Sequence, residues 1–391
     1  MHDRIGNRNL WTHSTALPTP MLFINPLAKT ALLFSCALSV LPLRAAESLE
    51  HRLYVAEPGI RNDLQYGGHG VLVFDMDGGH RFIRRIPFGG IDDKGTPRNV
   101  KGICANAATK RLYVSTTHTL SCIDLVTEKV LWEKPYAGGC DRMSMTPDGA
   151  QIYLPSLESD FWNVVDAATG DVIKRIDTPR AGSHNTVVDA SGAHAYLAGL
   201  HTPLLRVVDT KTREVTLEAG PFGSAIRPFT VNGKGTLCFV NVNGLLGFEV
   251  GDLTTGKKLC RVEVQGFLSG DVKRHGCPSH GIGLTPDEKE LWISDGHNQR
   301  VHYFDATTMP PRQLGNIALR DDPGWVTFSI DGRYAYPSSG EVVDVATHKI
   351  IGTLEDEQGH HVASEKLLEI DFENAQPVRA GDQFGRGMKQ E

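Results

Sequence analysis

Two sets of polar side chains recur along the 391-residue chain at matching intervals of 40 to 53 residues. The first set contains Lys101, Asp141, His184, Arg227, His280 and Gly324, with Trp325 beside the last. The second set contains His118, Glu158, His201, Gly244, His297 and Glu341. An ordinary series of buried positions would not present lysine, aspartate, histidine, arginine and histidine in turn. The recurrence therefore predicts a site assembled from distant segments.

The first set suits acid–base chemistry on a negatively charged substrate. An imidazole titrates near neutral pH, so His280 or His184 could act as a general base. Lys101 and Arg227 would then stabilise the charge that develops on the substrate. For the second set, together with Trp325 and His361, we predict a role in binding substrate through His118, His201, His297 and Glu158.

The same side chains could instead hold one divalent metal ion, with His184, His280 and Asp141 as ligands and a position left for water or substrate. The chain has no His-x-His or His-x-x-x-His spacing, so such ligands would come from separate segments. A single histidine at such a position also commonly bonds only water or backbone, and the second set could reflect a repeated loop preference.

The intervals belong to an internal repeat whose first piece is an apolar pair, Asp, two residues and Thr. Its clear copies contain Asp124, Asp166, Asp209, Asp305 and Asp344, and weaker copies contain Asp75 and Asp252. Asp and Thr at this spacing can bond nearby backbone and close a tight turn between strands.

A second piece, in register with the first, is a short strand centred on an aromatic residue. Its seven centres are Tyr54, Tyr113, Tyr153, Tyr196, Phe239, Trp292 and Tyr336. Turns such as Thr146-Pro147-Asp148-Gly149 precede most copies, and another short strand precedes each turn. The unit is therefore four strands in about 42 residues, which is typical of a β-propeller blade. We predict an all-β, seven-bladed propeller over residues 47–391.

At Tyr113-Val114-Ser115-Thr116 and the matching pieces, the chain resembles the YVTN-repeat β-propellers over roughly residues 50–391. The resemblance implies seven blades and a ring closed by pairing N-terminal with C-terminal strands. The stretch from His360 should then supply the innermost strand of the shared blade. The same family includes lyases, lactonases and plain binding proteins, so the resemblance indicates a fold more than a function.

The propeller explains why the two sets should meet. We label the four strands of a blade a to d, from the axis outward. Each residue of the first set lies eight positions before the glycine, or its equivalent, of the turn between strands a and b, which is the start of strand a. The seventh such position falls at His360 or His361. The second set lies in the loops after strand b, which open on the same face. The long connections 59–69, 88–100 and 266–279 open there too, as expected of a binding face.

Composition and the N-terminal sequence limit the class of partner and the compartment that we expect. A net charge of −6 without a long basic run argues against a nucleic-acid partner. The apolar stretch Thr30–Leu43 follows Lys29 and precedes Ala45-Ala46, which is typical of a signal peptide with cleavage near Ala46, and Met21 could be the true start. We therefore expect residues 1–46 to be an extension and signal peptide, no stable membrane span, and a periplasmic or secreted product.

Export would place six cysteines in an oxidising compartment, and we expect buried small residues with at most one or two disulfides. The function predicted is a His-dependent lyase or hydrolase, with or without a divalent metal, acting on a small polar or carbohydrate-like ligand. The alternative is a non-catalytic propeller that binds a ligand or protein at the same face. An enzyme predicts imidazoles converging in an enclosed pocket, and a binding scaffold predicts histidines spread over an open face.

Overall fold

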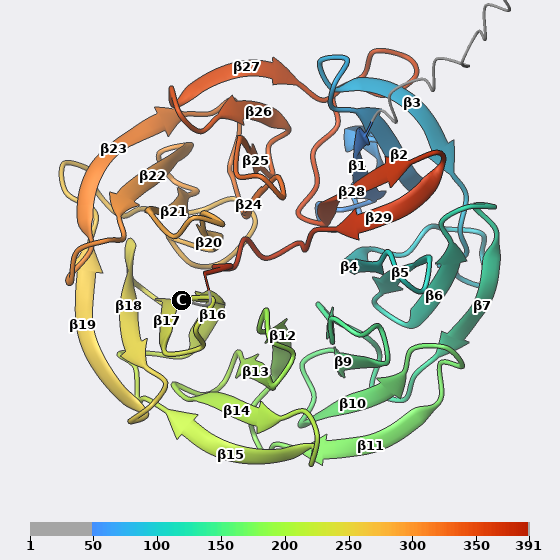
Figure 1. Cartoon of the computed structure of the whole chain (residues 1–391). Coiled ribbons are helices and arrows are strands. Elements are labelled where there is room, and N and C mark those ends of the chain that lie inside the picture. The colour runs from blue at the N-terminus through green and yellow to red at the C-terminus, as the bar shows by residue number, and fades with distance from the viewer. Residues whose placement is uncertain (1–48, 390–391) are drawn as a thin grey trace, which may run out of the picture. The chain divides into compact units, whose positions relative to one another are not determined.

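The computed structural model describes residues 49–389, and these form a ring of seven antiparallel sheets (Figure 1). The predicted N-terminal extension and signal peptide lie outside the described residues. The predicted seven-bladed all-β propeller is confirmed. Among the described residues, no helix is long and apolar enough to cross a bilayer.

Each blade runs from an inner strand to an outer one in chain order. The second to fourth blades are β4 (Val100–Asn106), β5 (Arg111–Thr116), β6 (Thr119–Asp124), β7 (Val130–Pro135); β8 (Ser144–Met145), β9 (Gln151–Pro155), β10 (Phe161–Asp166), β11 (Val172–Asp177); and β12 (Ser183–Val188), β13 (His194–Gly199), β14 (Leu205–Asp209), β15 (Glu214–Ala219). The fifth to seventh are β16 (Ile226–Val231), β17 (Leu237–Val242), β18 (Gly247–Asp252), β19 (Lys257–Glu263); β20 (Ile282–Leu284), β21 (Glu290–Asp295), β22 (Arg300–Asp305), β23 (Arg312–Ala318); and β24 (Val326–Phe328), β25 (Tyr334–Pro337), β26 (Glu341–Asp344), β27 (Lys349–Thr353).

The first blade closes the ring as expected, by pairing the two ends of the propeller. Its strands, from the centre outward, are β29 (Gln376–Ala380), β28 (Leu367–Glu373), β1 (Leu49–Glu57), β2 (Gly70–Asp75) and β3 (Arg81–Ile86), with a 3-10 turn, η1 (Leu64–Tyr66), between β1 and β2. Leu53 pairs with Glu369 in the antiparallel β1–β28 ladder. The additional strand β29 makes this the one five-stranded sheet of the described chain.

The C-terminal pairing strand begins at Leu367, later than the expected start at His360. The Asp356 carboxylate accepts hydrogen bonds from the backbone N–H groups of Gln358 and His360, which fold this segment into a turn. His361 then pairs with Glu355 in an isolated bridge. The backbone N–H groups of Val362 and Ala363 then donate to Leu354 and Tyr66 instead of to β1, and the strand starts at Leu367.

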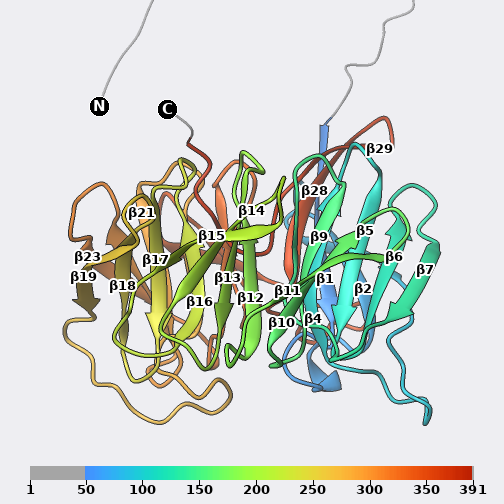
Figure 2. The same ribbon diagram turned by 90° about the horizontal axis from the view of Figure 1, so that it is seen from below.

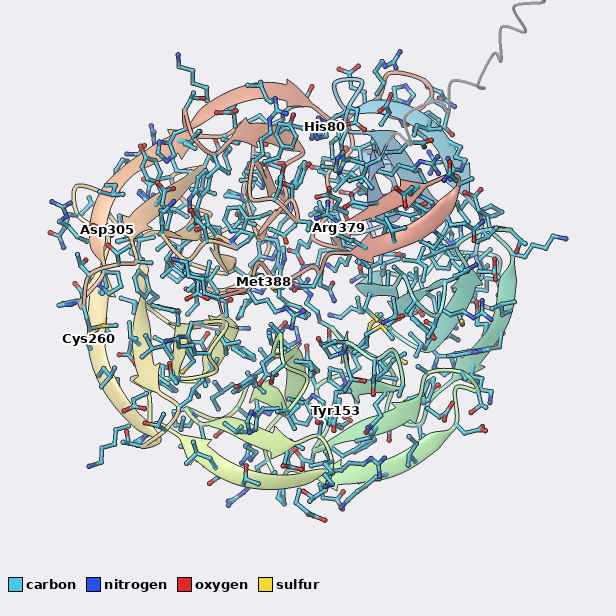
Figure 3. The ribbon with its side chains drawn as sticks, viewed as in Figure 1. His80, Tyr153, Cys260, Asp305, Arg379 and Met388 are labelled. Atoms are coloured by element: carbon cyan, nitrogen blue, oxygen red, sulfur yellow. The ribbon has the colours of Figure 1, made fainter. Side chains whose placement is uncertain are left out.

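Apolar packing between neighbouring blades holds the ring together. Seven separate buried clusters each join side chains of two adjacent blades, such as Val164 with Leu197 and Phe248 with Phe304. Strands covered on both faces present apolar side chains to both neighbours, as sheet-on-sheet packing requires. All six cysteines of the described residues are free thiols; five are buried, and Cys260 lies half-buried in the outermost strand β19 (Figure 3). The expectation of buried small residues holds, and the described chain contains no disulfide.

The two faces of the ring differ. The long connections 87–99 and 264–281 lie on one face, and residues 381–389, the last of the described chain, lie toward the other (Figure 2). After β29, residues 381–389 cross the centre of the ring and bond to inner strands of several blades. The central channel is therefore closed from the C-terminal face and open toward the long connections.

Candidate functional site

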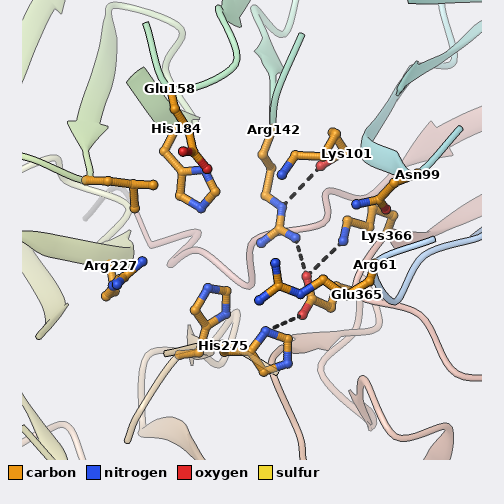
Figure 4. A pocket seen from close by; sticks show the side chains of 12 residues that line it. Arg61, Asn99, Lys101, Arg142, Glu158, His184, Arg227, His275, Glu365 and Lys366 are labelled. Atoms are coloured by element: carbon orange, nitrogen blue, oxygen red, sulfur yellow. Dashed lines mark hydrogen bonds and ion pairs between the residues drawn. The ribbon is translucent and has the colours of Figure 1, made fainter. Parts of the chain in front are cut away.

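A polar pocket lies where the inner strands begin, on the face of the long connections (Figure 4). It contains roughly 550 Å³ of empty space, part of it open to solvent. Its lining residues are Arg61, Asn99, Lys101, Arg142, Glu158, His184, Leu200, Arg227, His275, His280, Glu365 and Lys366. They come from six of the seven blades or the connections beside them, so the ring brings together side chains more than 300 positions apart in the sequence.

His184 and Asp141 form a hydrogen-bonded pair at the pocket wall. The Nδ1 atom of His184 lies 2.6 Å from Oδ2 of Asp141, whose other oxygen lies 3.1 Å from Nζ of Lys101. Asp141 is almost fully buried, and although burial raises its pKa, attraction to His184 and Lys101 holds that pKa at about 2. The ionised carboxylate therefore accepts from Nδ1–H of the imidazole and leaves Nε2 of His184 with its lone pair.

The charge of this pair at neutral pH depends on two opposing effects on the pKa of His184, burial and the attraction of Asp141. Burial lowers the pKa of His184, and the attraction of Asp141 restores part of it without reaching the ordinary value. His184 is therefore a neutral imidazole at neutral pH, fixed in one tautomer by a buried carboxylate. This is the arrangement that acid–base enzymes use to present a base.

A second group surrounds Glu365. One carboxylate oxygen of Glu365 lies 2.7 Å from Nη2 of Arg142 and 2.8 Å from Nζ of Lys366, and the other lies 3.3 Å from Nδ1 of His275. Burial lowers the pKa of Lys366 to about 8, despite the attraction of Glu365. Lys366 can therefore exchange a proton near neutral pH. The single carboxylate of Glu365 thus bonds two basic groups, Arg142 and Lys366.

His280 and His275 stack on the opposite side of the pocket from His184. Their ring centroids are 4.5 Å apart and their planes differ by 25°. Nδ1 of His280 lies 2.9 Å from the carbonyl oxygen of Gly324, to which it donates, so Nε2 of His280 is unprotonated when the ring is neutral. Burial lowers the pKa of His280 well below its ordinary value, and the neighbouring His275 lowers it further. Both stacked rings are thus neutral at neutral pH.

Trp325 and the C-terminal segment, residues 381–389, hold Arg142 in place from the closed end of the channel. Its guanidinium carbon lies 3.6 Å from the centre of the Trp325 ring, which is a cation–π contact. The indole N–H of Trp325 donates to the carbonyl oxygen of Gln383, and the side-chain amide of Gln383 donates to the carbonyl oxygen of Met143. The closed end of the channel therefore sets the position of an arginine at the pocket.

The pocket contains five of the ten side chains that we predicted as catalytic or substrate-binding: Lys101, Glu158, His184, Arg227 and His280. Asp141, predicted as a metal ligand, lies behind two of them. The remaining five lie elsewhere, and their predicted roles stay predictions. His118, His201 and His297 are exposed on the rim, with His201 in a shallow hollow next to Glu158. His361 is half-buried beside Arg320, and Trp325 lies under Arg142.

Besides the apolar Leu200, six polar lining residues escaped the sequence analysis: Arg61, Asn99, Arg142, His275, Glu365 and Lys366. Arg61, Asn99 and His275 belong to the three long connections, which the sequence placed on this face without indicating which side chains point inward. Lys366 lies eight positions before Asn374, which adopts the left-handed backbone conformation in the turn between β28 and β29. The turns at Gly149, Gly192 and Gly235 instead join the first two strands of a blade, so the offset used for the other blades reaches Lys366 only once the structure has shown this turn.

Comparisons with known proteins add a fold likeness and no function. No protein-family model matches the chain, and no curated protein matches it. Among solved structures, the chain is similar to hydrazine synthase from Kuenenia stuttgartiensis, with 16% identity over 64% of this chain and 94% of that one and a TM-score of 0.44. At this level the likeness carries no argument about chemistry. The seven-bladed fold stands on the strand topology, and the YVTN-repeat family stays a prediction.

Proposed function

We propose that this protein is an exported enzyme, a lyase or hydrolase that removes a proton from a small polar or carbohydrate-like substrate. The observation that carries the proposal is the His184–Asp141 pair inside a cation-rich pocket. His184 receives the proton on Nε2, and the imidazolium that forms is stabilised by the buried Asp141 carboxylate.

The two reaction types share this first step and differ in where the proton comes from. In a lyase, His184 takes it from the carbon next to a carboxylate, and the electron pair forms a double bond as a leaving group departs from the neighbouring carbon. In a hydrolase, His184 takes the proton from a water molecule that adds to a lactone or ester carbonyl. In both, negative charge grows on substrate oxygen, and the lining cations Arg142, Arg227 and Lys366 are placed to stabilise it.

The non-catalytic alternative is favoured by fewer observations. His118, His201 and His297 do spread over an open rim, as a binding scaffold would have them. His184 from the fourth blade and His275 and His280 from the connection before β20 instead line one pocket, which is the arrangement expected of an enzyme. Converging imidazoles with a buried carboxylate behind one of them therefore favour catalysis.

A divalent metal fits this pocket poorly. Of the predicted ligands, His280 belongs to a trio with His275 and Glu365 whose donor atoms lie within 4.8 Å of one another. Glu365 already serves Arg142 and Lys366, whose charges repel a cation. Metal-bound imidazoles point in-plane lone pairs at the ion, and two nearly parallel stacked rings would first have to rotate. Metal analysis of the wild type and His280→Ala tests the predicted ion, and equal metal content in both would exclude His280 as a ligand.

The proposed reaction is tested by screening acidic sugars, neutral sugars and lactones against the wild type and His184→Gln. Mass spectrometry of the products separates elimination, which leaves a double bond, from hydrolysis, which adds water. We expect conversion by the wild type and a loss of roughly 10³-fold in His184→Gln. Conversion at the wild-type rate by the variant would remove His184 as the base. N-terminal sequencing of protein from the native cell tests export, with Glu47 expected as the first residue.

A further inference from the structure

We infer that the ligand of this pocket is a small dianion, a dicarboxylate or a phosphate monoester, held across the pocket between arginines on opposite sides. This inference deepens the proposed function and rests on it, since it assigns the charge of the substrate that His184 would act on. It comes from the charges at the pocket and from donors that the protein itself leaves unused.

The first step is the charge balance. The lining contains the cations Arg61, Lys101, Arg142 and Arg227, together with Lys366, which is mostly protonated at neutral pH because its pKa is about 8. Against them stand three carboxylates, Glu158 and Glu365 in the lining and Asp141 behind it. The three lining imidazoles are neutral at neutral pH because burial lowers the pKa of each. Five positive charges against three negative ones leave two uncompensated. A cleft with such an excess concentrates anions.

The second step is that the excess resides on particular arginines. Among the described residues, neither Arg61 nor Arg227 has a carboxylate partner; Arg227 donates from Nε to the side-chain oxygen of Asn243, which carries no charge. Lys101 is matched by Asp141, whereas Arg142 and Lys366 share Glu365. Figure 4 shows Arg227 on one side of the pocket and Arg61 with Lys366 on the other. Two separate anionic groups would meet cations at both sides.

The third step is an unsatisfied buried donor. Nη1 of Arg142 is buried and has no hydrogen-bond acceptor among the described residues, although Nη2 and Nε of the same guanidinium are bonded. Only 3% of Arg142 is exposed. A buried guanidinium N–H without an acceptor destabilises a protein unless a ligand completes it. Figure 4 shows the Arg142 guanidinium directed into the space between His184 and Arg227. An oxyanion there would accept from Nη1.

Calorimetric titration of the purified protein tests the inference, with succinate and inorganic phosphate as dianionic probes and acetate and glucose as controls at equal ionic strength. We expect both dianions, or the better of the two, to bind at least about 10-fold more tightly than acetate, and glucose not to bind. Preference between succinate and phosphate distinguishes a dicarboxylate from a phosphate ester as the natural ligand.

Variants locate the binding. Arg227→Gln and Arg61→Gln should each weaken the preferred dianion roughly 10- to 100-fold, and Arg227→Lys should retain more affinity than Arg227→Gln. Arg180→Gln serves as the control, since Arg180 lies in the neighbouring hollow outside the pocket. Acetate or glucose binding as tightly as the better dianion, an unchanged affinity in Arg227→Gln, or no binding of any anion would each overturn the inference. His184-dependent turnover of a neutral substrate would then still leave the proposed function standing.

Discussion

The chemistry of the pocket depends on one imidazole whose surroundings fix both its proton and its orientation. Asp141 is buried, ionised and bonded on one side to Lys101 and on the other to His184. Lys101 and His184 both lower the pKa of this carboxylate and keep it charged, and the carboxylate in turn keeps Nε2 of His184 unprotonated. A buried partner of this kind matters more through tautomer and orientation than through net stability.

Asp141→Asn tests this arrangement directly. An asparagine amide would donate to Nδ1, place the imidazole proton on Nε2 and leave no base at the pocket. We expect turnover to fall roughly 10²- to 10⁴-fold while the protein stays folded. Steady-state kinetics with a substrate from the screen measures the loss. Asp160→Asn, an exposed acid on the same rim, is the control and should keep wild-type turnover.

The pH dependence of the reaction has a defined sign. A base must be unprotonated to work, so activity is present above the pKa of His184 and is lost as pH falls through it. Because burial lowers that pKa, the midpoint of the acid limb should lie below 6.5. Asp141 raises the pKa of His184 against burial, so in Asp141→Asn the midpoint of any residual activity should move to still lower pH. Rates measured across the acid range would contradict the assignment if the midpoint rose.

At the scale of the element, the short turns between strands place the side chains. In the turns between the two outer strands of a blade, the Asp side chain accepts from backbone N–H groups two and three positions later, as Asp166 does from Ala168 and Thr169. In the inner turns, left-handed residues such as Gly149 and Gly192 close the hairpin eight positions after Asp141 and His184. Because the hairpin length is fixed, the inner strands all start at the same level along the central axis of the ring.

Asp166→Ala should cost about 1 kcal/mol of unfolding free energy, because two backbone N–H groups lose their acceptor at an exposed turn. The turn lies on the face opposite the pocket, so anion binding should not change. Urea denaturation measures the difference. Asp177→Ala, which removes only an exposed pair with Arg175, is the matched control and should stay within about 0.5 kcal/mol of the wild type. Equal losses in both variants would show that the turn bonds contribute nothing specific.

At the scale of the molecule, the C-terminal segment after β29 joins the blades at the centre of the ring. Thr230 of β16 donates from its hydroxyl to the carbonyl of Gly385, and Arg386 donates to the carbonyl of Val188 in β12. One short segment is thus bonded to two blades of the ring. Phe384 is buried against Trp325 in the cluster between the fourth and fifth blades. The same segment closes the channel and supports Arg142 through Trp325, so ring stability and pocket geometry are coupled.

Phe384→Ala should therefore destabilise the protein by about 3 kcal/mol, the cost of removing a fully buried aromatic side chain. It should also weaken binding of the preferred dianion, because Trp325 and Arg142 lose support. Met388→Ala, further along the same segment and half exposed, should change stability by less than about 0.5 kcal/mol. Thermal unfolding and calorimetry give the two readouts. A stable Phe384→Ala protein with unchanged affinity would separate the segment from both roles.

The sequence by itself determined the four-stranded unit of a blade, the number of blades and the face of the ring on which the candidate site lies. Each depends on local sequence: the Asp turns, the aromatic strand centres, and the fixed offset that selects Lys101, His184, Arg227 and His280. Because these local patterns recur in every blade, they can be recognised in the sequence alone. Only the tertiary structure decided which side chains turn inward from irregular connections, as Arg61 and His275 do. It also decided that Asp141 pairs with His184 from the next blade, and that His280 stacks on His275, because the packing of adjacent blades and the path of an irregular connection are not encoded in the spacing of the repeat.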